Sequence, residues 1–194
     1  MKRLATLLPL TLVLAGCGSE YINVTPEVDY RPLQCVEQEG RVSGMLVLLA
    51  QSVPTASAVP CVHSTPVDWT IHEFNARDSR ARLGLSYGQA QEETFVIDVV
   101  GRCELGSATE SPSDQPGMRR YDRVAQGNAQ YAMDRYYVEP DACTAFHYLG
   151  GGAHAAEHAT EIASTFGFIQ RYALDRQVRQ FTDGRLHLDP EPTR

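Results

Sequence analysis

The first apolar segment of the chain is short and follows a positively charged start. Residues 4–16 are almost wholly apolar or small, and Lys2 and Arg3 precede them. A membrane-spanning helix needs roughly 20 apolar residues, so this run is too short to be one. A basic start, a short apolar core and small residues at its end are typical of a secretory signal. The pattern therefore predicts an exported protein.

The apolar run ends in Leu14-Ala15-Gly16-Cys17, which resembles a bacterial lipobox. The resemblance implies that residues 1–16 are removed as a signal peptide and that the thiol of Cys17 is diacylated. Two acyl chains on one residue anchor a protein stably, whereas one chain does not. We therefore expect a lipoprotein on the outer face of the cell membrane or in the cell envelope. An ordinary signal peptide with an incidental cysteine is the alternative.

The rest of the chain predicts one domain on a short tether. Residues 17–32 are mostly polar and contain prolines, which is typical of an extended linker. Residues 33–190 are enough to form a single α+β domain with its own core, and residues 191–194 are a tail.

The strongest apolar cluster after the signal predicts a helix over residues 42–52. Ser43 can cap its start, and Pro54 prevents it from continuing. A short buried strand is the alternative, because a continuous apolar run is compatible with both. Residues 54–66 are then expected to be a loop that carries Cys61. The apolar positions with helical spacing are Val42, Met45, Leu46 and Leu49.

From Trp69 onward the apolar positions alternate, as they do in a half-buried strand. Residues 69–72 and 83–87 both alternate, and Asn75 to Asp78 supplies turn chemistry between them. This arrangement predicts a hairpin. Residues 93–103 contain enough Val and Ile to predict an interior third strand.

The alternation is interrupted once and then resumes. Residues 104–128 are rich in Ser, Pro, Gly, Asp and Gln without a sustained period, so we expect a long surface loop. Residues 131–139 and 143–149 predict two more strands. The sequence thus predicts one antiparallel sheet of about five strands.

Two helices are expected after the sheet. Gly150 to Gly152 should end the last strand, and a helix is predicted from Ala155 to Phe166, closed by Gly167. A final helix is expected to bury Leu174, Val178 and Phe181, with Arg176 and Arg179 in solvent and Gly184 at its end. The predicted fold class is α+β, with the sheet covered by one N-terminal and two C-terminal helices.

Four cysteines remain if Cys17 is acylated, and an even number in an exported chain indicates disulfides. Three connectivities are possible for Cys35, Cys61, Cys103 and Cys143. We favour Cys35–Cys61 with Cys103–Cys143, because each pair links neighbouring segments. Buried free thiols are the alternative.

The charge of the chain limits the classes of partner. The formal net charge is −7, and removal of Lys2 and Arg3 would make it −9. Such an acidic protein lacks the basic surface that nucleic acid requires. The same charge disfavours electrostatic attachment to anionic lipid, so we expect attachment through the diacylglyceryl group of Cys17. An envelope protein or a glycan is a possible further partner.

Two observations indicate the source of the protein. Lys2 is the only lysine among 17 basic residues, a bias that a GC-rich genome would produce. Residues 48–61 and 174–190, and more weakly residues 107–120, resemble uncharacterised exported or membrane-anchored proteins of actinobacteria. This resemblance implies lineage and an envelope location, and it transfers no catalytic residue.

The segment His154-Ala155-Ala156-Glu157-His158 matches the H-x-x-E-H signature of inverzincin metallopeptidases. On a helix, His154 and His158 would share one face, and Glu161 could be a third zinc ligand. The pitrilysin and insulinase peptidases that carry this motif use a further glutamate far downstream, for which the chain is too short. We therefore expect a solvent-facing helix without a metal or cofactor, and a zinc-dependent hydrolase is the alternative.

Aromatic residues provide the other candidate surface. If they gather on one face of the sheet, they could form a platform for a ligand, although such residues are more often core. No set of residues predicts a catalytic centre. The sequence therefore predicts a non-catalytic binding or accessory domain in the envelope. The aromatic residues concerned are Trp69, Tyr121, Tyr131, Tyr136, Tyr137 and Tyr148.

Overall fold

A computed structural model describes residues 33–35, 42–64, 67–88, 93–127 and 129–190 of the 194-residue chain. The predicted signal peptide, Cys17, the tether and the tail of residues 191–194 lie outside the described residues. Within the described residues, no helix is long and apolar enough to span a membrane.

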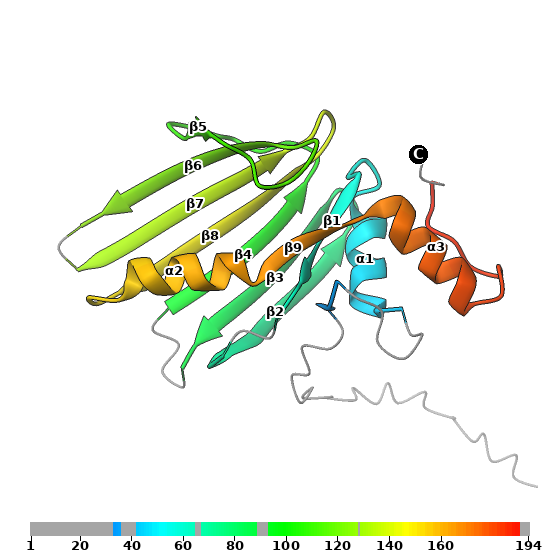
Figure 1. Ribbon diagram of the computed structural model, residues 1–194, viewed down its shortest axis with the longest axis horizontal. Helices are drawn as coiled ribbons and strands as arrows, with labels where there is room; N and C mark the ends of the chain where they lie inside the picture. Colours follow the sequence, from blue (N-terminus) through cyan, green and yellow to red (C-terminus); the bar gives the residue numbers. More distant parts are fainter. Residues whose placement is uncertain (1–32, 36–41, 65–66, 89–92, 128, 191–194) are drawn as a thin grey trace, which may run out of the picture.

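The described chain has an α+β fold with a seven-stranded antiparallel sheet and a two-stranded sheet (Figure 1). The large sheet has the order β2-β3-β4-β8-β7-β6-β5, and β1 pairs with β9 in the small one. The elements are α1 (Gly44–Ser52), β1 (Ala58–Val62), β2 (Trp69–Arg77), β3 (Arg80–Tyr87), β4 (Glu93–Val100), β5 (Thr109–Ser111), β6 (Arg119–Gln126), β7 (Gln130–Val138), β8 (Cys143–Gly151), α2 (Ala155–Ser164), β9 (Phe166–Gln170) and α3 (Arg171–Phe181).

The large sheet has one covered face and one open face. The helices α1 and α2 and the small sheet all lie on the covered face (Figure 1). The helix α3 contacts β9 and lies beyond the sheet, so the prediction that both C-terminal helices cover the sheet was wrong for α3. The α+β class and the antiparallel sheet were predicted, but the number of strands was not.

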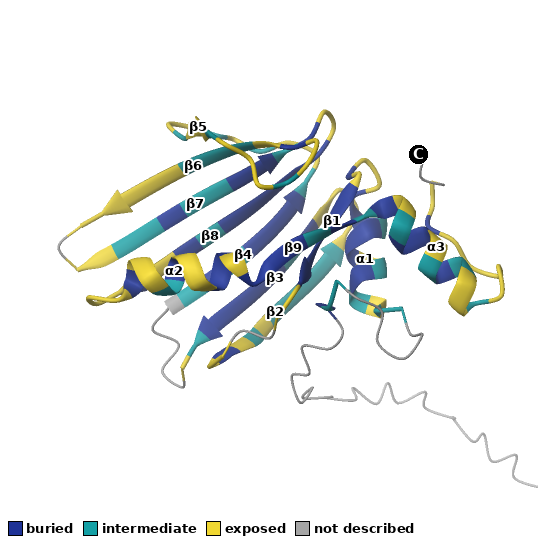
Figure 2. Cartoon of the chain, in the orientation of Figure 1, coloured by how far each residue is buried: buried dark blue, intermediate teal, exposed yellow. Residues whose placement is uncertain are grey.

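The core lies between the covered face and this outer layer (Figure 2). Because side chains alternate along a strand, every second residue of the central strands is buried there. Phe95 and Phe146 meet edge to face with ring centres 5.5 Å apart, and Phe166 of β9 stacks on Phe95 at the same distance. These rings join the two sheets.

The first helix forms where the apolar spacing predicted it. The side chain of Ser43 accepts a hydrogen bond from the backbone nitrogen of Leu46 at 3.2 Å, so it is the expected N-cap. Leu46 and Leu49 are buried, and the helix ends at Ser52, two residues before Pro54.

The predicted hairpin is β2–β3, but its turn is shorter than expected. Asn75 to Arg77 continue β2, and only Asp78 and Ser79 connect the strands. Ser79 adopts a left-handed φ of 67°, and its backbone nitrogen donates to the carbonyl oxygen of Ser52 at 2.8 Å. This bond fixes the turn against the end of α1. Local turn propensities do not reveal such a contact, because its partners are distant in sequence.

The expected loop over residues 54–66 is wrong, because it contains β1. All residues of β1 are buried, so the strand shows no alternation in sequence. The helix predicted to reach Phe166 stops at Ser164, and β9 begins at Phe166. Gly167 does not close a helix: it lies in β9, where a Cβ would be 1.9 Å from Nε2 of His63.

The expected loop over residues 104–128 is also wrong, because β5 and β6 lie within it. Most side chains of β6 are exposed or half-buried on both faces, so no apolar alternation marks the strand. Gly150 and Gly151 continue β8 rather than ending it, and Gly152 follows with a left-handed φ of 87°.

The final helix, α3, buries Leu174 and Val178 as predicted, whereas Phe181 is 54% exposed. The chain after α3 returns to the body, because Leu188 is fully buried and its nitrogen donates to Asp175 at 2.7 Å. Arg171 is also buried and donates to the carbonyl oxygens of Ala50 and Asp189. Arg171 thus joins the end of α1 to the C-terminal segment.

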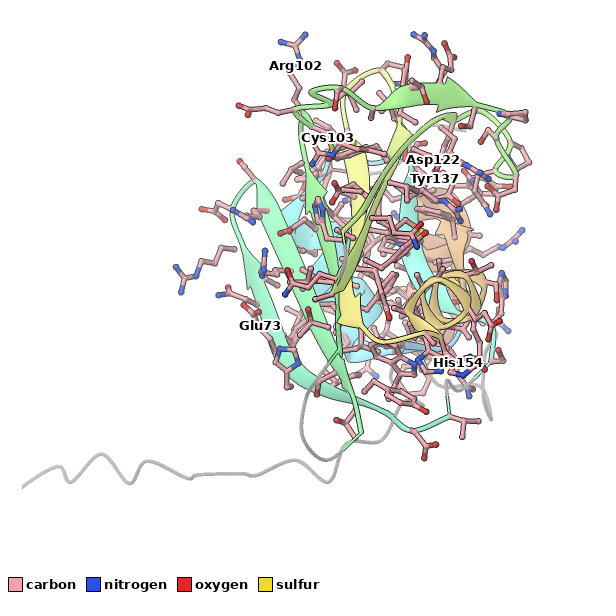
Figure 3. The ribbon with its side chains drawn as sticks, turned by 90° about the vertical axis from the view of Figure 1, so that its left-hand side faces the viewer. Glu73, Arg102, Cys103, Asp122, Tyr137 and His154 are labelled. Atoms are coloured by element: carbon pink, nitrogen blue, oxygen red, sulfur yellow. A yellow bond between two sulfur atoms is a disulfide. The ribbon has the colours of Figure 1, made fainter. Side chains whose placement is uncertain are left out.

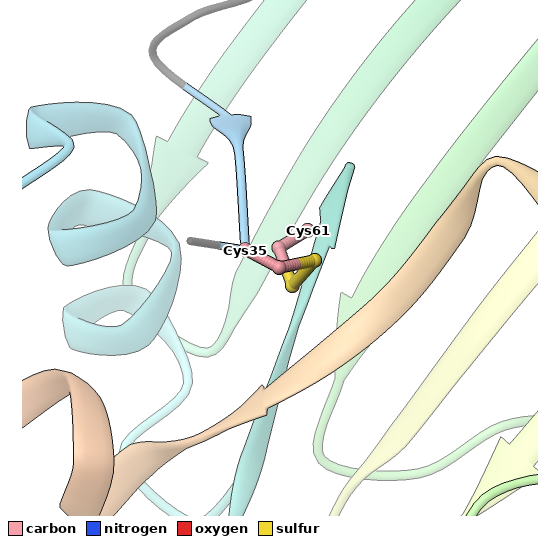
Figure 4. Close-up of a disulfide and its surroundings, with 2 residues drawn as sticks. All are labelled: Cys35 and Cys61. Atoms are coloured by element: carbon pink, nitrogen blue, oxygen red, sulfur yellow. A yellow bond between two sulfur atoms is a disulfide. The ribbon is translucent and has the colours of Figure 1, made fainter. Parts of the chain in front are cut away.

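Two disulfides are present, with the favoured pairing Cys35–Cys61 and Cys103–Cys143. The first joins the N-terminal segment to β1 (Figure 4). The second holds the segment after β4 against the start of β8, on the open face. There Leu105 and Ala108 pack with Tyr136 and Ala145 in a small second core.

Candidate functional site

The histidines of the H-x-x-E-H segment lie at the start of α2, where His154 is the N-cap residue and His158 lies in the first turn. Nδ1 of His154 is 3.0 Å from a carboxylate oxygen of Glu157, and both side chains are more than 70% exposed. His158 packs against the ring of Tyr87 with centres 4.8 Å apart. Within the described residues, no three or more His, Cys, Asp or Glu side chains are grouped to hold a metal ion, and Glu161 does not complete such a group.

The aromatic residues do not form a surface platform. Trp69, Tyr136, Tyr137 and Tyr148 are each no more than 4% exposed, and they are divided between the two cores. Tyr121 and Tyr131 are half-buried at different places on the sheet. Most of these rings are therefore core residues, which was the more frequent case expected, and the alternative of an aromatic platform does not hold for them.

The candidate with the most distinctive charge is a cavity at the turn end of the β2–β3 hairpin. It has a volume of about 340 Å³, and we call it the arginine pocket. In the register of the hairpin, Asn75 lies opposite Arg82, and Arg77 lies opposite Arg80. Side chains two residues apart along a strand share a face, so all four project from the open face. The residues that line the arginine pocket are Asn75, Arg77, Arg80 and Arg82.

A nearly buried carboxylate fixes two of the arginines. Asp98 on the neighbouring strand β4 is 9% exposed in its side chain. One of its oxygens accepts from Nη2 of Arg80 at 2.7 Å, and the other accepts from Nη1 of Arg82 at 2.8 Å. Glu73 accepts from Nε of Arg82 at 3.2 Å. These bonds hold both guanidinium groups and leave Nη1 of Arg80 and Nη2 of Arg82 without a bond to any described residue.

Arg77 differs from its neighbours because it forms no ion pair with any described residue. It lies directly opposite Arg80, and like charges in opposed positions of a hairpin repel. The pocket thus brings three guanidinium groups together against two carboxylates. The positive charge is in local excess here, whereas the chain as a whole has a net charge of −7. The arrangement is suited to bind a carboxylate or phosphate group.

A second charged cluster lies on the covered face of β6 and β7, the face to which Tyr137 belongs. Asp122 accepts from Nε of Arg120 and from Nε of Arg135, both at 2.8 Å. Burial would raise the pKa of Asp122, but the hydrogen bonds from Arg135 and Arg120 outweigh it and lower the pKa. Figure 3 shows Asp122 beside Tyr137 on the side of the sheet where α2 lies, and Glu73 on the other side.

Tyr137 extends this second cluster into the core. Its side chain is buried, and burial, together with the nearby charge of Asp114, raises its pKa to about 12. Its hydroxyl donates to Asp114 at 3.0 Å, and Arg120 lies 3.5 Å from the same carboxylate oxygen. We call Arg120, Arg135, Asp114, Asp122 and Tyr137 the matched cluster, because its two arginines meet two carboxylates.

A third group lies on the open face, across β6, β7 and β8. Asp134 contacts Nη2 of Arg123 at 2.5 Å and Nδ1 of His147 at 2.6 Å. The carboxylate is 18% exposed in its side chain and His147 is 37% exposed. No hydroxyl or thiol nucleophile is bonded to His147 within the described residues, so this pair does not make a catalytic triad.

Sequence reasoning missed the arginine pocket, although a signal was available. The segment Asn75-Ala-Arg77-Asp78-Ser79-Arg80-Ala-Arg82 places three arginines around a turn. The turn predicted over residues 75–78 does not pair Arg77 with Arg80. A two-residue turn at Asp78 and Ser79 would have predicted the pairing of Arg77 with Arg80, although not the contribution of Asp98 from β4.

Comparison of the chain with models of known protein families and with curated proteins finds no match. The class that the fold and the pocket define is an α+β domain, cross-linked by two disulfides, with an arginine-lined cavity on the open face of its sheet.

Proposed function

We propose that the protein is an exported, lipid-anchored binding domain of the cell envelope, without catalytic activity, that binds an anionic group of its ligand in the arginine pocket. The ligand class is a molecule with a phosphate or carboxylate group. Export and lipid attachment rest on residues 1–17 and are supported by the two disulfides, which suit an oxidising compartment.

One observation carries the binding function: Arg77 and Arg80 oppose each other, and only Arg80 has a carboxylate partner among the described residues. An unmatched pair of this kind costs stability in the unliganded domain. An anion between the guanidinium groups would remove the repulsion. Positions with locally unfavourable interactions are frequently functional. Here the unfavourable interaction is between two positive charges, so the ligand that relieves it is expected to be negative.

The test is a titration of the full-length protein in detergent micelles with inorganic phosphate. Binding is monitored through the NMR signals of the arginine side-chain Nε–H groups. We expect the signals of Arg77, Arg80 and Arg82 to move together with one dissociation constant. Arg77→Ala should weaken binding by about five- to tenfold, the effect of one lost charge-assisted contact.

The matched control is Arg176→Ala, which removes the same charge from an exposed position on α3. It should leave the phosphate affinity unchanged. Equal weakening by both variants would mean that phosphate responds to overall charge, and the pocket would then have no specific role.

The membrane anchor is tested separately with Cys17→Ala. We expect this variant to accumulate as an unprocessed precursor that keeps its signal, or to be released as a soluble protein. A processed variant that stays in the membrane would contradict the lipid anchor, because something other than the acyl chains would then retain it.

A further inference from the structure

We propose that the arginine pocket is one half of a two-part site, and that a second cavity beside it binds the sugar ring of the ligand. The ligand class is then an anionic carbohydrate, such as a phosphorylated or uronic-acid glycan. This inference rests on the proposed function, because the arginine pocket supplies the anion subsite.

The second cavity, which we call the end cavity, has a volume of about 440 Å³. It opens at the end of the sheet where β2 turns into β3, β4 ends and β7 turns into β8. Ser79 lines the end cavity, while Arg77 and Arg80, on either side of the same two-residue turn, line the arginine pocket. The two cavities are therefore neighbours across this turn. The residues that line the end cavity are Val53, Pro54, Thr55, Ser79, Gly101, Arg102, Pro140 and Asp141.

The walls of the end cavity are held in place without a ligand. The nitrogen of Ala56 donates to the carbonyl oxygen of Val53 at 3.0 Å, and that of Glu139 donates to Ala142 at 2.9 Å. The buried carboxylate of Glu139 also accepts from the nitrogen of Ser57 at 2.6 Å. These bonds link the segment after α1 to the β7–β8 turn.

Two further links complete the frame of the end cavity. The bond from Ser79 to Ser52 fixes the β2–β3 turn. The disulfide Cys103–Cys143 fixes the chain directly after Arg102 (Figure 3). A preformed cavity binds with a smaller loss of conformational entropy than a mobile one.

The lining of the end cavity has the mixed character that a sugar ring requires. Pro54 and Pro140 offer rigid apolar surfaces, against which the C–H face of a pyranose can pack. Asp141 accepts hydrogen bonds and Arg102 donates them, and both are exposed side chains without an ion pair to a described residue. Thr55 and Ser79 add hydroxyl groups that do both. The cavity is within the volume range of sites for small molecules, roughly 300 to 1,000 Å³.

The charges decide how the ligand is oriented. Arg102 and Asp141 balance each other in the end cavity, so it favours a neutral group with many hydroxyls. The arginine pocket carries the surplus positive charge and favours the anion. A sugar phosphate or a uronic-acid unit joins these two chemistries within one residue of a glycan.

The experiment compares three probes on the full-length protein in detergent micelles: inorganic phosphate, D-glucose and α-D-glucose 1-phosphate. We expect glucose 1-phosphate to bind about tenfold more tightly than inorganic phosphate, the gain from one or two additional hydrogen bonds to charged groups. The backbone amide signals of Thr55 and Gly101, which lie away from the arginine pocket, should shift with the sugar phosphate and stay in place with phosphate alone.

The variant Asp141→Ala should remove most of the advantage of glucose 1-phosphate over inorganic phosphate. Glu161→Ala, an exposed acidic position on α2, is the matched control and should keep that advantage. Amide signals also report whether each variant is folded, so a binding loss is not confused with unfolding.

The outcomes separate this inference from the proposed function. Phosphate binding without any gain from the sugar, or a gain that Asp141→Ala leaves intact, overturns the two-part site and leaves the anion pocket standing. Binding of glucose as tight as that of glucose 1-phosphate also overturns it, since the anion would then contribute nothing. Absence of phosphate binding overturns the proposed function, and the two-part site with it.

Discussion

The arginine pocket and the matched cluster use the same motif in different ways. In each, one carboxylate is shared by two guanidinium groups: Asp98 by Arg80 and Arg82, and Asp122 by Arg120 and Arg135. The matched cluster adds a second carboxylate, Asp114, so its charges balance. The pocket adds Glu73 but also a third arginine, Arg77. Balanced charges stabilise the domain itself, whereas a surplus leaves charge for a ligand.

The largest stability effect is expected for Asp98→Asn in the pocket. The carboxylate is 9% exposed in its side chain and bonds two arginines, so its loss should lower the free energy of unfolding by about 2–3 kcal/mol. Urea unfolding at pH 7 measures this. Glu73→Gln, whose carboxylate is 39% exposed, is the control and should cost less than about 1 kcal/mol. Equal costs would mean that burial of Asp98 has no influence on the strength of its bonds.

Asp122→Asn tests the matched cluster and should cost about 1–2 kcal/mol at pH 7. Folding lowers the pKa of Asp122, so its contribution to stability is present above about pH 4 and is lost as the pH falls through the folded-state pKa. The variant should therefore lose less stability on acidification than the wild type. Melting temperatures between pH 2.5 and pH 7 measure the difference, with the exposed Glu161→Gln as the control. Parallel profiles for wild type and Asp122→Asn would contradict the prediction.

An element could be predicted from the sequence when it has one buried face and one solvent-exposed face. The helix α1 and the strands β3, β4, β7 and β8 were predicted because a buried stripe marks them. The strand β1 is buried throughout, and β6 is polar on both faces, so neither shows a period. Their pairing is decided by contacts distant in sequence, such as Gly167 beneath the ring of His63.

The candidate site was less predictable than the fold, for a related reason. The arginine pocket depends on register: a turn of two residues places Arg77 opposite Arg80, and the longer turn that we expected does not. The contact between Ser79 and Ser52 that fixes this turn joins the hairpin to α1. Asp98 comes from a third strand, and no local pattern connects it to the hairpin. The segment 154–158 had the stronger motif, but no third ligand lies beside it among the residues that the structure describes.

Tyr137→Phe should have a smaller effect, about 1 kcal/mol near pH 7, because it removes one hydrogen bond to Asp114. Folding raises the pKa of this hydroxyl to about 12, so its contribution is present below about pH 10 and declines as the pH rises toward that value. The variant should lose less stability between pH 9 and pH 11.5. Tyr172→Phe, at a 44% exposed position, is the control. A steeper alkaline loss in Tyr137→Phe than in the wild type would contradict the assignment.

Arg77→Ala should have the smallest effect on stability. It tests whether the arginine pocket, unlike the matched cluster, contains an arginine that does not stabilise the fold. Arg77 has no ion pair to a described residue and faces Arg80, so its removal should change the free energy of unfolding by no more than about 0.5 kcal/mol. Urea unfolding in phosphate-free buffer measures this. Added phosphate should then stabilise the wild type more than the variant, because a ligand that binds only the folded state raises its stability. A loss above about 1 kcal/mol without phosphate would place Arg77 with the structural arginines, and the contrast between surplus and balanced charge would no longer hold.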